Sequence, residues 1–183
     1  MMRIDSFGRS AAFAAAIALG WIAWFVITAP VIGVGAARAL YLVAATALYA
    51  GALAASPPRR ASTTVVVGAF GLVLAAVAGG GSELALGLAI LLCTARGAFL
   101  HRTTPARAVA IEAVLVVGGL AFARFLATGA AQPTALALWG FFLVQSCFFL
   151  VGGIDVRRAD GRHPDPFEEA VARATEVIER GVA

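Results

Sequence analysis

Two opposite charges lie inside apolar stretches of the sequence: Arg96 in LLCTARGAFL (residues 91–100) and Glu112 in ARAVAIEAVL (residues 106–115). A carboxylate held by a guanidinium can bind a proton or an ion, and an ionisable residue within a membrane indicates function by default. The same pair can instead join two helices. Gln145, in WGFFLVQSCFFL (residues 139–150), is a third polar candidate, and we expect it to hydrogen-bond to another helix.

The spacing of the two charges favours the structural alternative. Arg96 and Glu112 lie eight positions either side of residue 104, the middle of the basic turn that joins their two apolar stretches. In an antiparallel helical hairpin both then lie at the same depth, roughly 10 Å from the tip. An unpaired charge in the hydrocarbon layer costs about 2.5–3.5 kcal/mol, so a pair at matched depth removes much of that cost.

Few other residues in this sequence suit catalysis, metal binding or cofactor binding. The histidines, His101 and His163, lie outside the middles of the apolar stretches, which excludes a haem held between helices by two histidines. Cys93 and Cys147 form no CxxC pair, and we interpret Cys93 as a small packing residue. The sequence contains no phosphate-binding glycine motif. We therefore expect no catalytic residue, no metal site and no cofactor.

The composition is that of a membrane protein. Of the 183 residues, 61% are hydrophobic and only 13% are charged, about half the charged share of a soluble domain. The net charge of +4 arises from arginines that flank the apolar stretches, and the sequence has no basic patch with interleaved aromatic residues. Nucleic-acid binding is therefore not expected.

Six apolar stretches are each close to the ~20 residues that a helix needs to cross the bilayer. We predict an all-α, polytopic integral membrane protein with a six-helix transmembrane bundle after a cytoplasmic N-terminus at 1–10. Pro30 either kinks the first helix or ends it near Ala29. The predicted spans, which together form a domain at 11–154, are 11–34, 36–55, 64–80, 83–101, 105–128 and 134–154.

The arginines predict the orientation. Arg59 and Arg60 lie between the second and third spans, and further arginines lie before the first span, between the fourth and fifth, and after the sixth. Only Arg38 and Arg124 lie on the opposite side, each near a helix end. The positive-inside rule then places both termini in the cytoplasm and the protein in the cytoplasmic (inner) membrane.

Two of the predicted helices carry distinct faces. On the fourth span Ala85, Ala89, Cys93 and Gly97 form a ridge of small residues that lets a neighbouring helix approach. On the sixth span the small face is expected to pack inward, while the aromatic face is open to lipid, a partner subunit or a hydrophobic ligand. That aromatic face comprises Phe141, Phe142, Gln145, Phe148 and Phe149.

A polar linker at 155–164 leads into a predicted amphipathic cytoplasmic helix at 165–180. Asp165 suits an N-cap and Pro166 the first helical position. Because the polar face of this helix mixes glutamate with arginine, docking onto protein is favoured over anionic lipid. Its apolar face, the candidate docking surface, comprises Phe167, Val171, Ala174 and Ile178.

Three functions fit this sequence. The first is a non-catalytic subunit or assembly component of a larger membrane complex that docks a partner through the C-terminal helix. The second is a small oligomeric transporter or channel whose path uses Arg96, Glu112 and Gln145. The third is a membrane enzyme acting on a lipid or quinone, with Glu112 as base and Arg96 holding an anionic headgroup. We expect the lipid bilayer and either a protein partner or a homo-oligomer as partners.

Overall fold

The computed structural model describes residues 4–54, 56–78, 81–100, 105–126 and 131–151, and this part of the chain is entirely helical apart from its connections. The predicted amphipathic helix at 165–180, with Phe167, Val171, Ala174 and Ile178, lies outside the described residues. The helices are α1 (Phe7–Ile32), α2 (Val34–Leu53), α3 (Pro57–Ala78), α4 (Ser82–Leu100), α5 (Pro105–Leu126), α6 (Ala131–Ser146) and α7 (Phe148–Val151).

Five helices are long and apolar enough to cross a membrane. By length and composition α1, α2, α3, the Val109–Leu126 part of α5 and the stretch Pro133–Leu150 can cross a bilayer. Helix α4 has 19 residues and is not in this set. The all-α multi-pass membrane class therefore holds.

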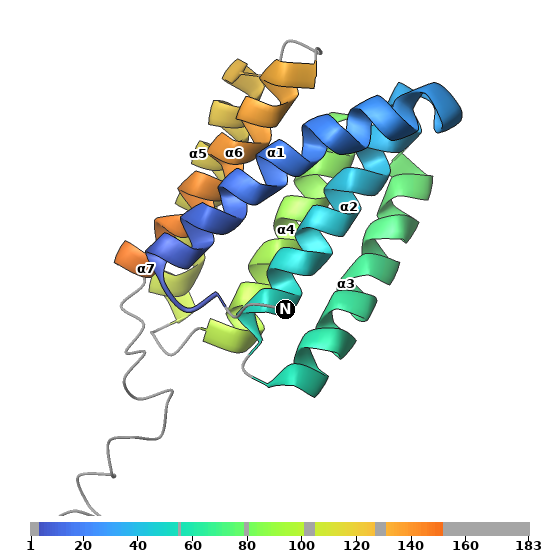
Figure 1. Cartoon of the computed structure of the whole chain (residues 1–183). Helices are drawn as coiled ribbons and strands as arrows, with labels where there is room; N and C mark the ends of the chain where they lie inside the picture. Colours follow the sequence, from blue (N-terminus) through green and yellow to red (C-terminus); the bar gives the residue numbers. More distant parts are fainter. Residues whose placement is uncertain (1–3, 55, 79–80, 101–104, 127–130, 152–183) are drawn as a thin grey trace, which may run out of the picture. The chain divides into compact units, whose positions relative to one another are not determined.

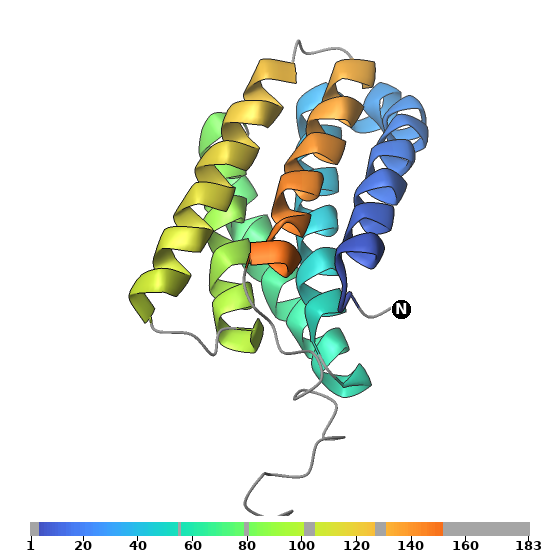
Figure 2. The same ribbon diagram turned by 90° about the vertical axis from the view of Figure 1, so that its left-hand side faces the viewer.

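Five helices pack in a closed ring, in the order α1, α2, α4, α5 and α6, with α6 returning to α1. Helix α3 lies outside this ring and packs only on α2 and α4 within the described chain, as its position beside α2 in Figure 1 shows. Figure 2 shows α5 and α6 side by side, with α4 behind them. The ring therefore closes through the contact of α6 with α1, which lie far apart in the sequence.

Pro30 does not end the first helix. Helix α1 continues through Pro30 to Ile32, where Gly33 donates its N–H to the carbonyl of Ala29. The alternative that the helix ends near Ala29 is therefore wrong. Gly33 alone connects α1 to α2, and its φ of 82° lies in the region that favours glycine.

The third helix begins at Pro57, earlier than the predicted start at residue 64. Proline is favoured in the first turn, where its missing N–H would have no partner in the helix. Two neighbouring contacts stabilise this turn, because Arg60 Nε donates to the carbonyl of Ala54 at 3.0 Å and the Arg60 N–H bonds the carbonyl of Ser56. The prediction relied on apolar composition, so it detected only the apolar part of this helix and missed its polar first turns.

The sixth predicted span is interrupted. Helix α6 ends at Ser146 and the short helix α7 begins at Phe148, with i→i−3 bonds from Cys147 to Val144 and from Leu150 to Cys147. The Ser146 hydroxyl lies 2.8 Å from the carbonyl of Phe142, a back-bonding contact that bends helices. The stretch Pro133–Leu150 is still long and apolar enough to cross a bilayer, so the predicted span contains a helix break at Cys147.

The small face of the sixth span packs inward as predicted, but the aromatic face is buried as well. Phe142 and Phe148 are buried at 2% and 1% exposure, and Phe142 packs against Phe13 of α1 and Tyr49 of α2. The small face is covered too, because a side chain at Gly140 would collide with Phe122 of α5. Both faces are buried because α6 packs on α1 and α5 at once.

Close contact between α2 and α3 depends on Gly51. A Cβ atom at this position would collide with Thr64 Oγ1 and lie 3.0 Å from the carbonyl oxygen of Arg60. Thr64 cannot move away freely, since its hydroxyl donates to that same carbonyl at 2.8 Å. The α2–α3 contact therefore requires glycine here.

Gly51→Ala is expected to destabilise the protein by about 1–3 kcal/mol through overpacking. Gly35→Ala is the matched control, because it lies on the same helix with no atom within 4 Å of the added Cβ. Thermal unfolding in mild detergent measures both variants. Equal melting temperatures for the two variants would contradict the close packing of α2 on α3.

Candidate functional site

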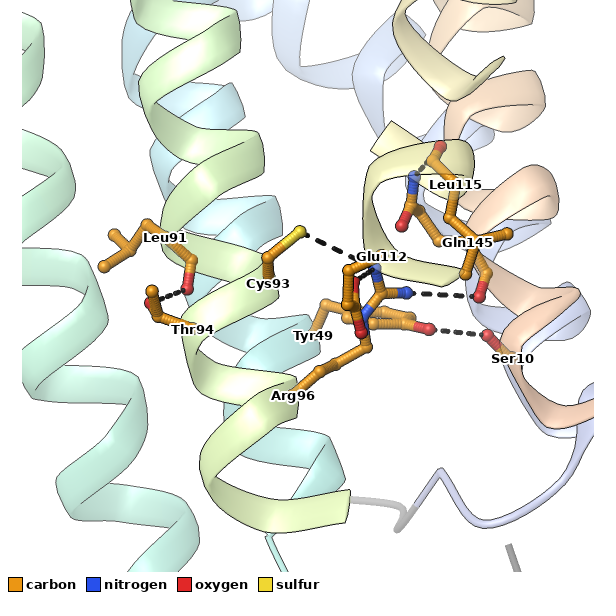
Figure 3. Close-up of polar contacts among 9 residues, drawn as sticks. All are labelled: Ser10, Tyr49, Leu91, Cys93, Thr94, Arg96, Glu112, Leu115 and Gln145. Carbon is orange, nitrogen blue, oxygen red and sulfur yellow. Dashed lines mark hydrogen bonds and ion pairs between the residues drawn. The ribbon is translucent and has the colours of Figure 1, made fainter. Parts of the chain in front are cut away.

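Arg96 lies at the centre of a buried polar cluster. Its side chain projects from α4 into the ring and forms an ion pair with Glu112 of α5 (Figure 3). A second guanidinium nitrogen lies 3.4 Å from the carbonyl oxygen of Gln145 on α6. The guanidinium carbon lies 5.2 Å from the centre of the Phe148 ring, within the range of a cation–π contact. Arg96 thus joins α4 to α5 and to the α6–α7 segment.

The predicted meeting of Arg96 and Glu112 is confirmed as a contact. Arg96 is fully buried and Glu112 is 8% exposed, so the pair lies inside the protein and not on its rim. Helices α4 and α5 follow each other in the chain and pack together, which is the hairpin that the depth argument assumed.

Gln145 makes the predicted hydrogen bond to another helix. Its side-chain nitrogen donates to the carbonyl oxygen of Leu115 on α5 at 2.9 Å. Gly119 permits this approach, because a Cβ there would lie 2.8 Å from the same nitrogen. Gln145 is fully buried, so this hydrogen bond takes the place of one that its side-chain nitrogen would make to water.

Three further polar residues extend the cluster, and sequence reasoning missed them. The hydroxyl of Ser10 on α1 lies 3.0 Å from that of Tyr49 on α2 and 2.8 Å from that of Ser146 on α6. Figure 3 shows the Tyr49 hydroxyl directed toward that of Ser10. We call the six residues the polar hub: Ser10, Tyr49, Arg96, Glu112, Gln145 and Ser146.

Each helix of the ring contributes to the polar hub. All six members are buried. A signal for the missed members did exist: Tyr49 lies four residues before the end of α2, just as Arg96 lies four before the end of α4. The depth argument, applied to every polar residue in an apolar stretch, would have placed Tyr49 beside Arg96.

Some hydrogen-bonding groups of the polar hub have no partner within the described residues. Arg96 Nε and Gln145 Oε1 are buried without a hydrogen-bond partner there. A buried unsatisfied group costs about 1–3 kcal/mol. The hub therefore specifies which helix faces meet more than it adds net stability.

A cavity of about 800 Å³ occupies the other end of the ring, where α2, α4 and α6 begin and α5 ends. Its walls are mostly apolar and include Leu42, Leu120 and Phe142, while Arg38 and Arg124 line it near the helix ends. Ala85 and Ala89, of the predicted small-residue ridge on α4, line this cavity. Arg96, Glu112 and Gln145 do not line it.

No group of three or more metal-ligating side chains occurs among the described residues. Cys93 lies with its sulfur 4.0 Å from a guanidinium nitrogen of Arg96, at the edge of the polar hub.

Comparison of the chain with protein-family models, with curated proteins and with solved structures finds no match. The polar hub and the cavity are the two features of the described residues that bear on function.

Neutralising one partner of the ion pair is expected to destabilise the fold. Glu112→Gln leaves Arg96 buried without its counter-ion, at a cost of about 2.5–3.5 kcal/mol. The double variant Arg96→Gln with Glu112→Gln should recover part of this loss, because no unpaired charge then remains. Thermal unfolding of the single and double variants in detergent measures the coupling, and strictly additive losses would contradict a structural ion pair.

Proposed function

We propose that this protein is a non-catalytic subunit or accessory component of a larger membrane complex. The observation that carries the proposal is the position of Arg96, which is fully buried and bonded to α5 and α6 at once. The polar hub uses the charges of the ring interior to join helices. Contact with other molecules is then left to the outer surfaces and the ends of the bundle.

The proposed topology has six crossings with both termini in the cytoplasm. Helix α4 supports the sixth crossing, because it packs on α2, α3 and α5 and runs between the same two ends of the bundle (Figure 1). The arginine bias of the loops supports the orientation in the cytoplasmic membrane.

Helix α3 offers a surface for a partner. It lies outside the ring, and Val66 and Phe70 are 52% and 59% exposed. Beside them a groove of about 300 Å³ runs between α3 and α4, lined also by Leu91 and Thr94. A groove of this size suits side chains from a transmembrane helix of a partner protein. The helix predicted at 165–180 supplies the second proposed docking surface, on the cytoplasmic side.

A second candidate function is transport by an oligomer of this protein. The 800 Å³ cavity favours it, because a carrier needs an internal site for its substrate. Arg96, Glu112 and Gln145 do not line that cavity, so the path proposed through them lacks its support. The third alternative, a lipid or quinone enzyme with Glu112 as base, ranks lower because Arg96 is fully enclosed.

Impermeant thiol labelling tests the topology. In a background with Cys93→Ala and Cys147→Ala, single cysteines are introduced as Gly8→Cys, Gly35→Cys and Ala183→Cys. Gly8 and Gly35 accept a side chain, because no atom lies within 4 Å of the added Cβ. We expect labelling at 8 and 183 from the cytoplasmic face and at 35 from the other face. Labelling of 8 and 183 from opposite faces would contradict an even number of crossings.

Photo-crosslinking in intact cells tests the partner surface. A photoreactive amino acid at Val66, beside the α3–α4 groove, is expected to crosslink to a defined protein. The matched control is Val114, a valine 71% exposed on α5. Removing residues 165–183 should reduce co-purification of the same protein. Crosslinks to lipid alone at both positions, with a monomer recovered from both chain lengths, would reject the subunit proposal.

A further inference from the structure

We propose that the 800 Å³ cavity binds an anionic phospholipid from the leaflet opposite the N-terminus. The phosphate group would lie between Arg38 and Arg124, and an acyl chain would fill the apolar interior. This inference does not depend on the proposed subunit function, because it concerns a different end of the ring.

The position of the two arginines supplies the charge for a headgroup. Arg38 lies in the second turn of α2 and Arg124 in the last turn of α5, at the same end of the bundle. Neither guanidinium forms a hydrogen bond or an ion pair with any residue that the structure describes. Glu83 is the acidic residue at this end within the described chain, and it does not line the cavity. Two cationic side chains at the mouth of an apolar cavity complement an anionic amphiphile.

The depth of the cavity suits one leaflet of the bilayer. On α2 the lining extends from Arg38 to Thr46, eight residues or roughly 12 Å along the helix. The hydrocarbon layer is about 30 Å thick, so the cavity reaches less than halfway across it. Phe142 lines the deep part, and the polar hub begins one turn further along α6 at Gln145.

The composition of the walls and an opening to the outer surface suit a hydrocarbon chain. Alanine, leucine and phenylalanine dominate the lining, and the volume lies within the roughly 300–1,000 Å³ of ligand pockets. Leu86 belongs to the lining and is 49% exposed, so the cavity extends to the outer surface of α4. A lipid can therefore enter from the bilayer. A neutral helix of a partner would leave both arginines without a counter-charge, which favours lipid as the occupant.

Native mass spectrometry of the full-length protein in detergent tests the proposal. The protein is titrated with phosphatidylglycerol, which is anionic, and with phosphatidylcholine of the same acyl chains, which is zwitterionic. We expect tighter binding of phosphatidylglycerol. Arg38→Gln and Arg124→Gln should each weaken it about fivefold, since a basic residue near the surface contributes about 1 kcal/mol to anionic-lipid binding. Phosphatidylcholine binding should not change.

Matched variants separate the cavity from the rest of the lipid-facing surface. Ala85→Phe places a large side chain in the cavity and should weaken both lipids, whereas Ala113→Phe, on the exposed face of α5, should not. Arg59→Gln, an exposed arginine at the other end of the bundle, is the charge control. Circular dichroism and a monodisperse elution profile establish that each variant is folded.

Three outcomes would overturn the proposal. Equal affinity for the two lipids would remove the role of the arginines. A loss with Arg59→Gln as large as that with Arg38→Gln would indicate general surface binding. Unchanged binding in Ala85→Phe would indicate a headgroup site without a chain in the cavity.

Discussion

A guanidinium group inside a helical bundle in a membrane needs a counter-ion, and Arg96 therefore constrains how its neighbours pack. Its ion pair with Glu112 fixes the faces of α4 and α5 that meet, and its contact with the Gln145 carbonyl brings α6 to the same point. Breaking any of these contacts would leave a charge or a polar group in an apolar interior, where its cost is largest. The arrangement of the ring follows from this requirement.

The polar hub and the cavity divide the ring interior into two halves of different chemistry. At one end buried polar side chains from all five ring helices meet. At the other end α2, α4, α5 and α6 enclose a mostly apolar cavity that carries arginines only near the helix ends. The polar hub joins the helices at one end, and the cavity separates them at the other end. The two features are thus consequences of the same packing.

Small residues and a helix break complete the arrangement. Gly119 allows Gln145 to reach α5, and Gly51 allows α3 to approach α2. The end of α6 at Ser146 lets one residue contact both α1 and its own preceding turn. The next residue, Cys147, separates α6 from α7, and Phe148 then lies over Arg96. The break between α6 and α7 therefore lies beside the polar hub.

The sequence by itself determined that the helices suit a lipid environment, where they lie approximately, and that Arg96 meets Glu112. Apolar length, loop arginines and equal distances from a turn are one-dimensional properties, and they do not depend on distant segments. Only the tertiary structure decided that the aromatic face of α6 is buried, that Ser10 and Tyr49 join the polar hub, and that α4 faces a cavity. In a bilayer apolar residues are stable on either face of a helix, because lipid and protein interior have similar polarity. Hydrophobic patterning therefore cannot specify which face turns inward, and contacts between helices distant in the sequence make that choice.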